Sequence, residues 1–358
     1  MKAGFLHEVR DGVTPRAGAL VLAVLALQLA FIASYIGAFH EPTPHRIPVA
    51  VAAPPEALDD LVGKLNRLPG DPLDARPAFS EDAARRMIDQ REVYGAFIVS
   101  GTDATDRLVV ASAAGAGVAT ALTQIITPLE DAQERAFTTE DAHPALLGDA
   151  RGLSGFYLAL GWVVGGYLVA IAVSTSKGSR PANPHRALVR LLSLALYSAL
   201  SGVGGALIAG SLFGALDGHF AQLLWFGALL VFASGCFTMA LQAAFGFVGT
   251  GLTVLLFVIL GNPSAGGAYP APLLPPFWRA IGQWLPPGLG TEAIRGIVYF
   301  SGAGVQRAAI VLGGYALFGL IGTLLVAQIA QPRQIVITPG QSLMPLERRD
   351  ALAPSSRS

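Results

Sequence analysis

The sequence is short of charge and nearly without cysteine. Only 13% of its 358 residues are Asp, Glu, Lys or Arg, and residues 220–278 contain none of these and no His. Soluble domains carry about 25% charged residues, so the composition excludes an ordinary soluble protein. The single Cys236 excludes an intramolecular disulfide, and the six scattered histidines form no Cys/His cluster for a metal. We therefore expect no cofactor and no metal.

Motifs for enzymatic chemistry are also missing. The chain has no G-x-x-x-x-G-K-[ST], and Lys177-Gly178-Ser179 lacks the glycine loop that should precede it. It has no H-E-x-x-H, no G-x-S-x-G and no G-x-G-x-x-G after a strand. Its net charge is zero, which gives no reason to expect a nucleic acid as partner. The sequence thus predicts a protein that is not an enzyme and has no nucleotide site of its own.

The sequence contains several long apolar runs. A helix of about 20 apolar residues crosses the hydrocarbon core of a bilayer. Six segments fit this length, and we predict an α-helical polytopic membrane protein whose spans are 17–39, 153–175, 190–216, 220–241, 245–261 and 308–330. The first apolar run is longer than the core of a signal peptide and ends without a clear cleavage site, so we expect an uncleaved anchor.

The distribution of Lys and Arg predicts the orientation of these spans. Short basic segments stay in the cytoplasm. The N-terminal segment 1–16, the loop 174–190 and the tail 331–358 are all basic, and six spans put them on one side. Both termini are then cytoplasmic, segments 40–152 and 262–306 lie outside, and the tail is expected to be disordered.

Segment 40–152 has the pattern of a small α+β domain. Ile47 to Ala53 predicts a strand, and Pro54 to Leu68 predicts a helix with an apolar face. Ser80 is a suitable N-cap for a helix over residues 81–90. The β-rich runs 94–100 and 108–112 flank a Gly/Thr/Asp loop, which is typical of a hairpin. Residues 117–137 look helical, and alternating elements of this kind indicate an extracytoplasmic α+β domain.

The predicted spans hold small residues where carriers hold charges. None places an ionisable residue near its centre, whereas ion-driven carriers usually need one. If this chain moves a substrate, the energy is therefore expected from a separate ATPase. Small residues four apart, such as Gly161 and Gly165, allow helices to approach closely in lipid. They serve either packing within one chain or the interface of a homodimer or heterodimer.

The segment before the last span is the most distinctive. Its prolines and glycines exclude a further span, and its aromatic residues suit the membrane interface. We expect short helices at about 275–285 and 289–300 at the outer surface, with Arg279 and Arg295 directed toward headgroups or each other's loops. The segment is either a structural cap or an external gate. The candidate gate residues are Gly261, Asn262, Pro263, Gly266, Gly267, Tyr269, Pro270, Arg279, Pro286, Pro287, Gly288 and Arg295.

These residues also support a resemblance to a known family. The chain reads GNPS-x-GG-x-YP, LLP-x-F-x-R-x-IG, LPPG, AIR and YF-x-G between residues 261 and 302. With one span, a large external domain and five further spans, it resembles the ABC-2-type permease superfamily. Within that superfamily it is most similar to the phage-infection-protein-like (Pip) and nitrosoguanidine-resistance-like membrane proteins. The resemblance implies a dimeric export permease that works with a separate ATPase, and it implies no catalytic residue.

Two functions remain open at this point. The first is an ABC-2-type export permease of the plasma membrane, which moves a hydrophobic or envelope-related substrate outward. Its ATPase is expected to dock on segment 1–16 and on the basic loop, whose candidate contact residues are Lys177, Arg180, Arg186 and Arg190. The second is an envelope protein that transports nothing and whose external domain binds a partner or serves as an attachment site. An intramembrane enzyme is disfavoured because the spans lack polar clusters.

Overall fold

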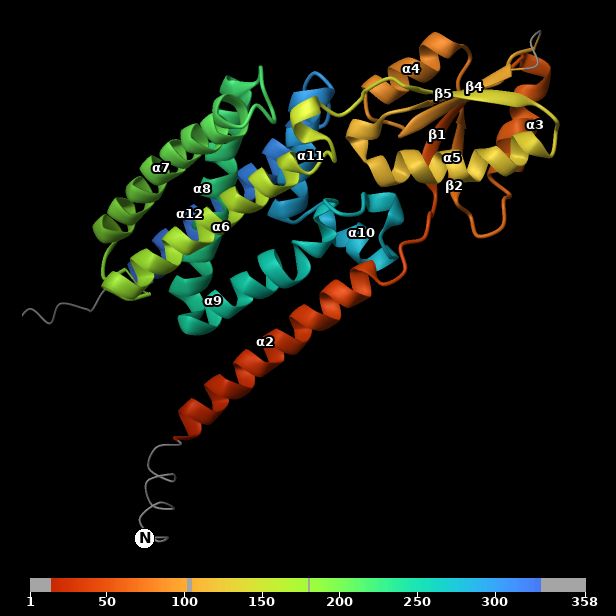
Figure 1. Cartoon of the computed structure of the whole chain (residues 1–358). Coiled ribbons are helices and arrows are strands. Elements are labelled where there is room, and N and C mark those ends of the chain that lie inside the picture. The colour runs from red at the N-terminus through yellow and green to blue at the C-terminus, as the bar shows by residue number, and fades with distance from the viewer. Residues whose placement is uncertain (1–13, 102–104, 180, 330–358) are drawn as a thin grey trace, which may run out of the picture.

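The computed structural model describes residues 14–101, 105–179 and 181–329. A long N-terminal helix leads into a domain built on a β-sheet, and the chain then returns to a bundle of long helices (Figure 1). Most of segment 1–16, Arg180 and the tail 331–358 lie outside the described residues, so the predictions made for them stay untested.

The domain between the first two long helices is a mixed sheet with helices on both faces. The strand order is β2-β1-β3-β4-β5, with β3 and β4 antiparallel and every other pair parallel. In chain order its main elements are β1 (Ile47–Ala52), α3 (Pro55–Leu65), β2 (Leu73–Pro77), α4 (Glu81–Asp89), β3 (Gly95–Ile98), β4 (Thr105–Val110), α5 (Ala116–Asp131) and β5 (Ala136–Asp141).

Each face of this sheet buries its own apolar cluster. Alternate β1 residues point to opposite faces, so Val49 packs under α3 and α5 while Ala50 packs under α4. Figure 1 shows α4 and α5 on opposite sides of the strands. Each cluster also takes in one residue from beyond the domain, Leu273 on one face and Phe300 on the other. The domain core is therefore completed by the segment that precedes the last long helix.

Local signals in this domain predicted most of its elements. The expected strand at Ile47, the helix that follows it and the hairpin are all present, and Ser80 Oγ accepts a hydrogen bond from the Ala83 N–H (3.1 Å). Strand β2 was not predicted because Asp74, Arg76 and Pro77 interrupt its pattern. Strand β5 was missed because the helical pattern of 117–137 continues into it, whereas α5 ends at Asp131.

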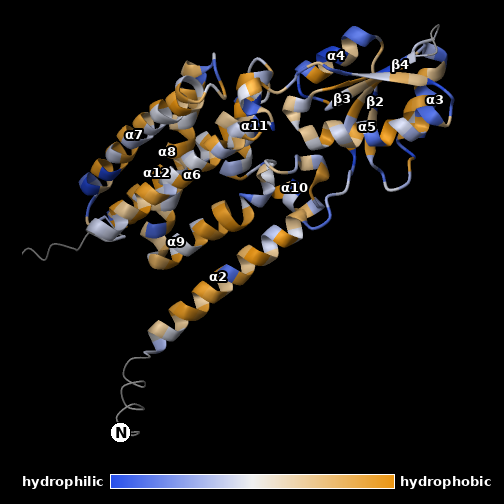
Figure 2. Cartoon of the chain, in the orientation of Figure 1, coloured by the Kyte–Doolittle hydropathy of each residue, from blue (hydrophilic) through white to orange (hydrophobic). Residues whose placement is uncertain are grey.

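Among the described residues, five helices are long and apolar enough to cross a membrane, which indicates a membrane-embedded helical protein. Figure 2 shows that apolar residues cover them along most of their length. They are α2 (Pro15–Phe39), α6 (Ser154–Lys177), α7 (Pro184–Leu207) with a π-helical continuation (Ile208–Leu212), α8 (Phe220–Phe245) and α12 (Val305–Ile329).

The predicted count of six spans is not confirmed. The segment expected to be the fifth span forms α9 (Phe247–Val254) and a π-helical stretch (Leu255–Leu260), together an apolar helix of 14 residues. At 1.5 Å per residue this length covers about 21 Å, less than the roughly 30 Å of a hydrocarbon core. The chain then continues in short 3₁₀ turns instead of a longer helix.

Helix α8 is the centre of the bundle, and α6, α7 and α12 pack around it (Figure 1). Small residues permit this contact. A Cβ added to Gly319 of α12 would lie 2.3 Å from the Cys236 backbone, and one added to Gly166 would lie 2.5 Å from the Val231 carbonyl oxygen. Gly161, by contrast, has nothing within 4 Å of such a Cβ. Packing within the chain thus explains why position 319 is a glycine, but it does not explain the glycine at position 161.

Helix α2 stands apart from this bundle. Only 6% of its most apolar window is buried, and most of its leucines and valines are exposed. Figure 1 shows the helix running away from the bundle. An isolated apolar helix of 25 residues is stable only where its surface meets lipid or another apolar surface. Its described contacts gather near its C-terminal end, against the segment that follows α9.

Candidate functional site

The distinctive segment 261–304 joins the three parts of the molecule. It contains α10 (Pro276–Gly282) and α11 (Pro286–Tyr299), close to the two short helices predicted at 275–285 and 289–300. Pro286 and Pro287 begin α11 instead of preceding it, because proline fits the first turn of a helix. We refer to residues 261–304 as the junction segment.

The glycines of the junction segment allow its backbone to fold tightly on itself. Gly266 has a left-handed backbone (φ +73°), which ends the 3₁₀ turn Pro263–Ala265. A Cβ added to Gly288 would lie 2.0 Å from the Gly282 carbonyl oxygen, and one added to Gly267 would lie 2.5 Å from the Phe156 ring. Of the glycines predicted as gate residues, Gly267 and Gly288 are therefore at positions where the packing leaves no room for a Cβ, and Gly266 is at a position that needs a left-handed backbone.

The first side of the junction holds the end of α2. Ser34 Oγ donates to the Ile259 carbonyl (2.5 Å) and accepts from Trp278 Nε1 (3.3 Å). The side-chain amide of Asn262 donates to the Tyr35 hydroxyl. The Trp278 ring fits against Gly37, where an added Cβ would lie 2.8 Å from the ring. These contacts are the means by which a nearly unburied helix is attached to the rest of the chain.

The second side of the junction holds the start of the sheet domain. Arg279 Nη1 donates to the carbonyl of His45, two residues before β1 (3.1 Å), and the His45 N–H donates to the Pro272 carbonyl (3.1 Å). The Tyr269 ring lies 5.8 Å from that of Phe39, centre to centre. The linker 40–46 between α2 and the sheet is thus held to the junction segment at His45, by one backbone hydrogen bond and one from the Arg279 side chain.

A charged cluster links the sheet domain to α11. Arg91, which follows α4, donates through Nη1 to the Glu292 carbonyl (2.7 Å) and pairs with the Glu292 carboxylate. Arg295 donates to the same carboxylate (2.8 Å) and to the Gly266 carbonyl (2.8 Å). Burial opposes ionisation of Glu292, but the two guanidinium groups outweigh it and hold the pKa of this carboxyl below its ordinary value.

Helix α11 is buried, which corrects one prediction. Most of its residues from Pro286 to Val298 are inaccessible, and it packs against α6, α8 and α12. Arg295 is only 4% exposed, so it does not face lipid headgroups. Arg295 instead reaches the carbonyl of Gly266, in the loop before α10. Arg279 reaches the His45 carbonyl in the linker before β1, which neither expected orientation included. The hydrophobic content of α11 is the reason for its burial, because burying it outweighs an interfacial position.

A second polar contact lies at the end of α11. The Tyr299 hydroxyl donates to Asp149 Oδ2 (2.7 Å), and Asp149 Oδ1 accepts from the Ser154 N–H at the start of α6 (2.8 Å). Burial and the neighbouring Asp149 carboxylate raise the pKa of the Tyr299 hydroxyl, so it stays a donor. Asp149, Tyr299, Arg91 and Glu292 were absent from the predicted site. The only sequence signal was Glu292 and Arg295 three residues apart on one helix face.

At the opposite end of the bundle, the basic loop forms a second candidate site. Helix α6 ends at Lys177, and Asn183 caps α7 by accepting from the Arg186 N–H (2.9 Å). Arg186 is exposed, and with Arg190 it lines a surface pocket of about 420 Å³. The structure thus brings these two predicted contact residues together, whereas Arg180 and the Lys177 side chain lie outside the described part of the chain.

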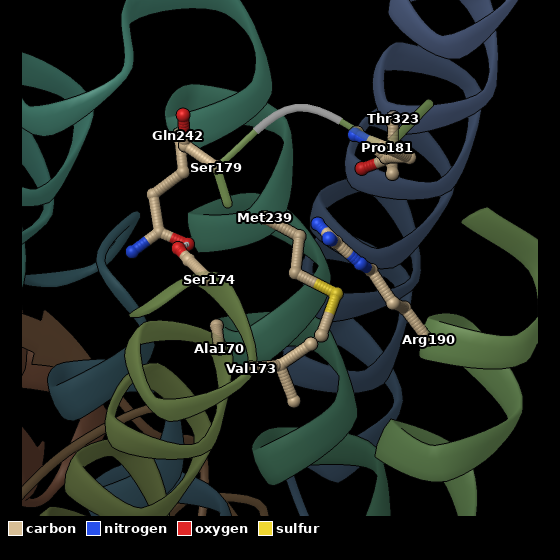
Figure 3. Close-up of a pocket in the computed structure, with 9 residues that line it drawn as sticks. All are labelled: Ala170, Val173, Ser174, Ser179, Pro181, Arg190, Met239, Gln242 and Thr323. Carbon is tan, nitrogen blue, oxygen red and sulfur yellow. Dashed lines mark hydrogen bonds between the residues drawn. The ribbon is translucent and has the colours of Figure 1, made fainter. Parts of the chain in front are cut away.

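Arg190 also reaches the inside of the bundle at this end. Figure 3 shows its guanidinium directed toward Met239 and Pro181. In the same small cavity the Ser174 hydroxyl donates to the Gln242 side chain (3.0 Å), which in turn donates to Thr250 (3.0 Å). The cavity has a volume of about 10 Å³, room for about one water. It is too small for a substrate.

No family model, curated protein or solved structure matches this chain. Among the described residues there is also no group of three His, Cys, Asp or Glu that could hold a metal ion. What the chain does must therefore be argued from the junction segment and from the basic end of the bundle.

Proposed function

We propose that this chain is the membrane permease subunit of an ABC-2-type export system, with its sheet domain outside the cell and both termini in the cytoplasm. The observation that supports this most is the position of the junction segment. The residues that resemble the permease family are those that contact α2, the bundle and the sheet domain at once. A shift of helices in the bundle would be transmitted through α11 to the external domain.

This proposal includes six crossings of the membrane. The stretch 247–262 begins beside Gln242, whose side chain bonds Ser174 three residues before the end of α6. It ends beside Tyr35, four residues before the end of α2. The C-terminal ends of α6 and α2 lie at opposite faces of the membrane if both helices span it. A 14-residue helix extended by the turns after Leu260 connects them, and this supports a short fifth crossing.

The absence of charge inside the helices favours an external source of energy. Among the described residues, the buried polar side chains within the five long helices are Ser and Thr, with Gln242. None of these can bind and release a proton, so a proton-driven cycle lacks its relay. An ATPase bound at the cytoplasmic face supplies the missing energy. Arg186 and Arg190 offer it a basic surface, although a basic inner loop is also expected from the positive-inside rule.

An apolar groove between α6 and α7 suits a hydrophobic substrate. It has a volume of about 770 Å³, within the range of ligand sites. Gly161, Gly204 and Gly205 line it together with Trp162, whose Nε1 donates to the Ser201 carbonyl (3.0 Å). Part of its wall is the π-helical turn at Ile208, a form that recurs at functional sites. The groove explains why no described residue packs against Gly161.

The alternative function is an envelope protein that binds a partner outside and transports nothing. One observation favours it: Phe79 on the sheet domain is 93% exposed. A large aromatic side chain in water is typical of a binding surface when it belongs to a patch. Phe79 is flanked by buried Ala78 and by exposed Ser80, so the apolar area is small. We therefore prefer the permease.

Co-purification tests the permease most directly. The tagged chain is isolated in mild detergent from its native host, and ATP hydrolysis is measured in the eluate. We expect ATP hydrolysis in the eluate of the parent chain. The double change Arg186→Gln and Arg190→Gln should lower this activity at least tenfold without changing expression of the chain. The matched control is Arg86→Gln, an exposed arginine on the sheet domain. Transport by the chain alone in vesicles, driven by a proton or sodium gradient, would overturn the proposal.

A further inference from the structure

A cavity of about 410 Å³ lies between the sheet domain and the membrane helices. Its walls come from the start of α5, from the loop 150–153 before α6 and from residues 267–270 of the junction segment, with Arg295 behind them. In Figure 1 the beginning of α5 faces the junction segment. This volume lies in the range of ligand pockets, and the site is separate from the groove between α6 and α7.

The first feature of this cavity is a set of unused backbone donors. Helix α5 begins after Gly115, which has no side chain to cap the helix. The N–H groups of Ala116 and Gly117 in the first turn have no partner inside the helix. A Cβ added to Gly115 would lie 2.2 Å from Pro270, so the close approach of the two walls depends on glycine. The helix thus presents bare N–H groups and the positive end of its dipole to the cavity.

The second feature is a buried arginine in the wall. Arg295 is 4% exposed, and its Nε–H is buried without a hydrogen-bond partner in the part of the chain that the structure describes. Its two other nitrogens are fixed by Glu292 and by the Gly266 carbonyl. An unsatisfied buried donor on a charged group is costly, so native sites rarely contain one without a ligand or water.

The charged groups around the cavity differ in whether they have partners. Glu292 is shared by Arg91 and Arg295, so one carboxylate balances two guanidinium groups. Arg151 is an exposed wall residue with no ion pair among the described residues. The nearby acids are already engaged, since Asp149 accepts from Tyr299 and Ser154, and Asp141 accepts from the Ser112 and His143 N–H groups. Among the described residues, the Arg151 guanidinium and the Arg295 Nε–H are thus donors at the cavity for which no partner is seen.

The place of the cavity in the fold points to the source of its ligand. Loop 150–153 leads directly into α6, and Tyr269 in the opposite wall contacts Phe39, the last residue of α2. Both helices are long enough to cross a membrane, so the cavity lies at the level where their ends meet water. Tyrosine is enriched at this level, and lipid phosphates lie there too.

We propose that this cavity binds the phosphate of an anionic lipid headgroup. The first-turn N–H groups of α5 would donate hydrogen bonds to the phosphate oxygens, as they do at helix N-termini in other phosphate sites. Arg151 and Arg295 would supply charge-assisted hydrogen bonds, while Tyr269 and Leu153 border the glycerol region. The site does not depend on the chain being a permease, because a lipid can bind here whether or not anything is transported.

Thermal unfolding of the full-length chain in a neutral detergent tests this site. The chain is titrated with dihexanoyl phosphatidylglycerol, dihexanoyl phosphatidylcholine or inorganic phosphate. We expect the midpoint to rise only with phosphatidylglycerol, because binding to the folded state stabilises it. Arg151→Gln should raise the half-saturating concentration about tenfold, the effect of one charge-assisted hydrogen bond.

A second variant keeps the test independent of arginine. Ala116→Asp places a carboxylate in the exposed first turn of α5, where it favours the helix but repels phosphate. It should abolish the response without lowering the midpoint of the lipid-free chain. Its control is Ala57→Asp, in the exposed first turn of α3, which should respond like the parent chain. An equal response to phosphatidylcholine, a response to inorganic phosphate that matches that to the lipid, or an unchanged response in Ala116→Asp would each refute the proposal.

Discussion

Arg91 and Glu292 are 201 positions apart in the sequence, yet the Arg91 guanidinium binds both the carbonyl and the carboxylate of Glu292. The contact connects the turn after α4 with a helix buried among α6, α8 and α12. The Arg91 guanidinium also lies 5.3 Å from the centre of the Phe300 ring, which closes one face of the sheet core. Arg91 therefore fastens the sheet domain to the bundle by charge and by packing.

Removal of the Glu292 charge is expected to destabilise this attachment. Glu292→Gln leaves Arg295 buried without an anion, and the unpaired charge should lower the free energy of unfolding by about 2 kcal/mol. Thermal unfolding in detergent measures the loss. Glu92→Gln is the matched control, because Glu92 is exposed and has no ion pair among the described residues. Equal midpoints for the two variants would show that the cluster contributes nothing.

The pair Asp106 and Glu130 predicts a pH dependence. Both side chains are almost inaccessible, and Arg135 donates to Asp106 (2.6 Å). Burial raises the pKa of Glu130 to about 7, and its hydrogen bond to Asp106 and the Asp106 charge act in the same direction. Asp106 remains ionised, since the hydrogen bonds from Arg135 and from the Ser100 N–H outweigh burial and lower its pKa.

The sign follows from the two states of Glu130. The folded chain holds the Glu130 proton more tightly than the unfolded chain, whose carboxyl has its ordinary pKa near 4.5. This contribution to stability is complete below pH 4.5 and is lost as the pH rises through 7. Between pH 5 and 8 the free energy of unfolding of the parent chain should fall by an amount on the order of 2–3 kcal/mol, and Glu130→Gln should abolish this fall. Thermal unfolding at the two pH values measures it, and Glu134→Gln should retain the parent's dependence.

Cysteine labelling is expected to place the sheet domain outside and to decide the short fifth crossing. The only native cysteine, Cys236, is buried, so single introduced cysteines report cleanly. In intact cells an impermeant maleimide should label Ala57→Cys and Gln306→Cys, whereas Ala182→Cys should react only after permeabilisation. All three positions are exposed or near it in the fold. Labelling of Ala57→Cys without Gln306→Cys would mean that 247–260 does not cross.

The sheet domain is expected to fold on its own if its last strand is kept. A fragment of residues 46–142 includes β5. A fragment that ends at residue 138 lacks Thr139 and therefore loses the pairing of that residue with Leu108. The first should unfold cooperatively in urea, followed by circular dichroism, and the second should be markedly less stable. The loss of Leu273 and Phe300, which lie outside both fragments, limits the stability of each. Non-cooperative unfolding of the longer fragment would mean that the domain depends on the bundle.

The sequence by itself determined the membrane character and most of the local structure. A run of 20 apolar residues has few alternatives to a helix in lipid, so α2, α6, α7, α8 and α12 could be located from composition alone. The same holds for the helix after Ser80, because an N-cap acts within one turn of its own residue. The junction helices could also be located to within a few residues, although α11 begins at Pro286 and not at the predicted residue 289.

Only the tertiary structure decided how these elements are used. Composition could not show that α11 is buried and not at the surface, because its apolar residues suit either place and packing against α6 and α12 makes the choice. Strands β2 and β5 carry polar residues, and they are strands because β1 and β4 supply neighbours for their backbone hydrogen bonds. The Arg91–Glu292 contact and the cavity beside Arg295 join residues that are far apart in the chain. The sequence pattern around one such residue does not show which distant residue it will contact.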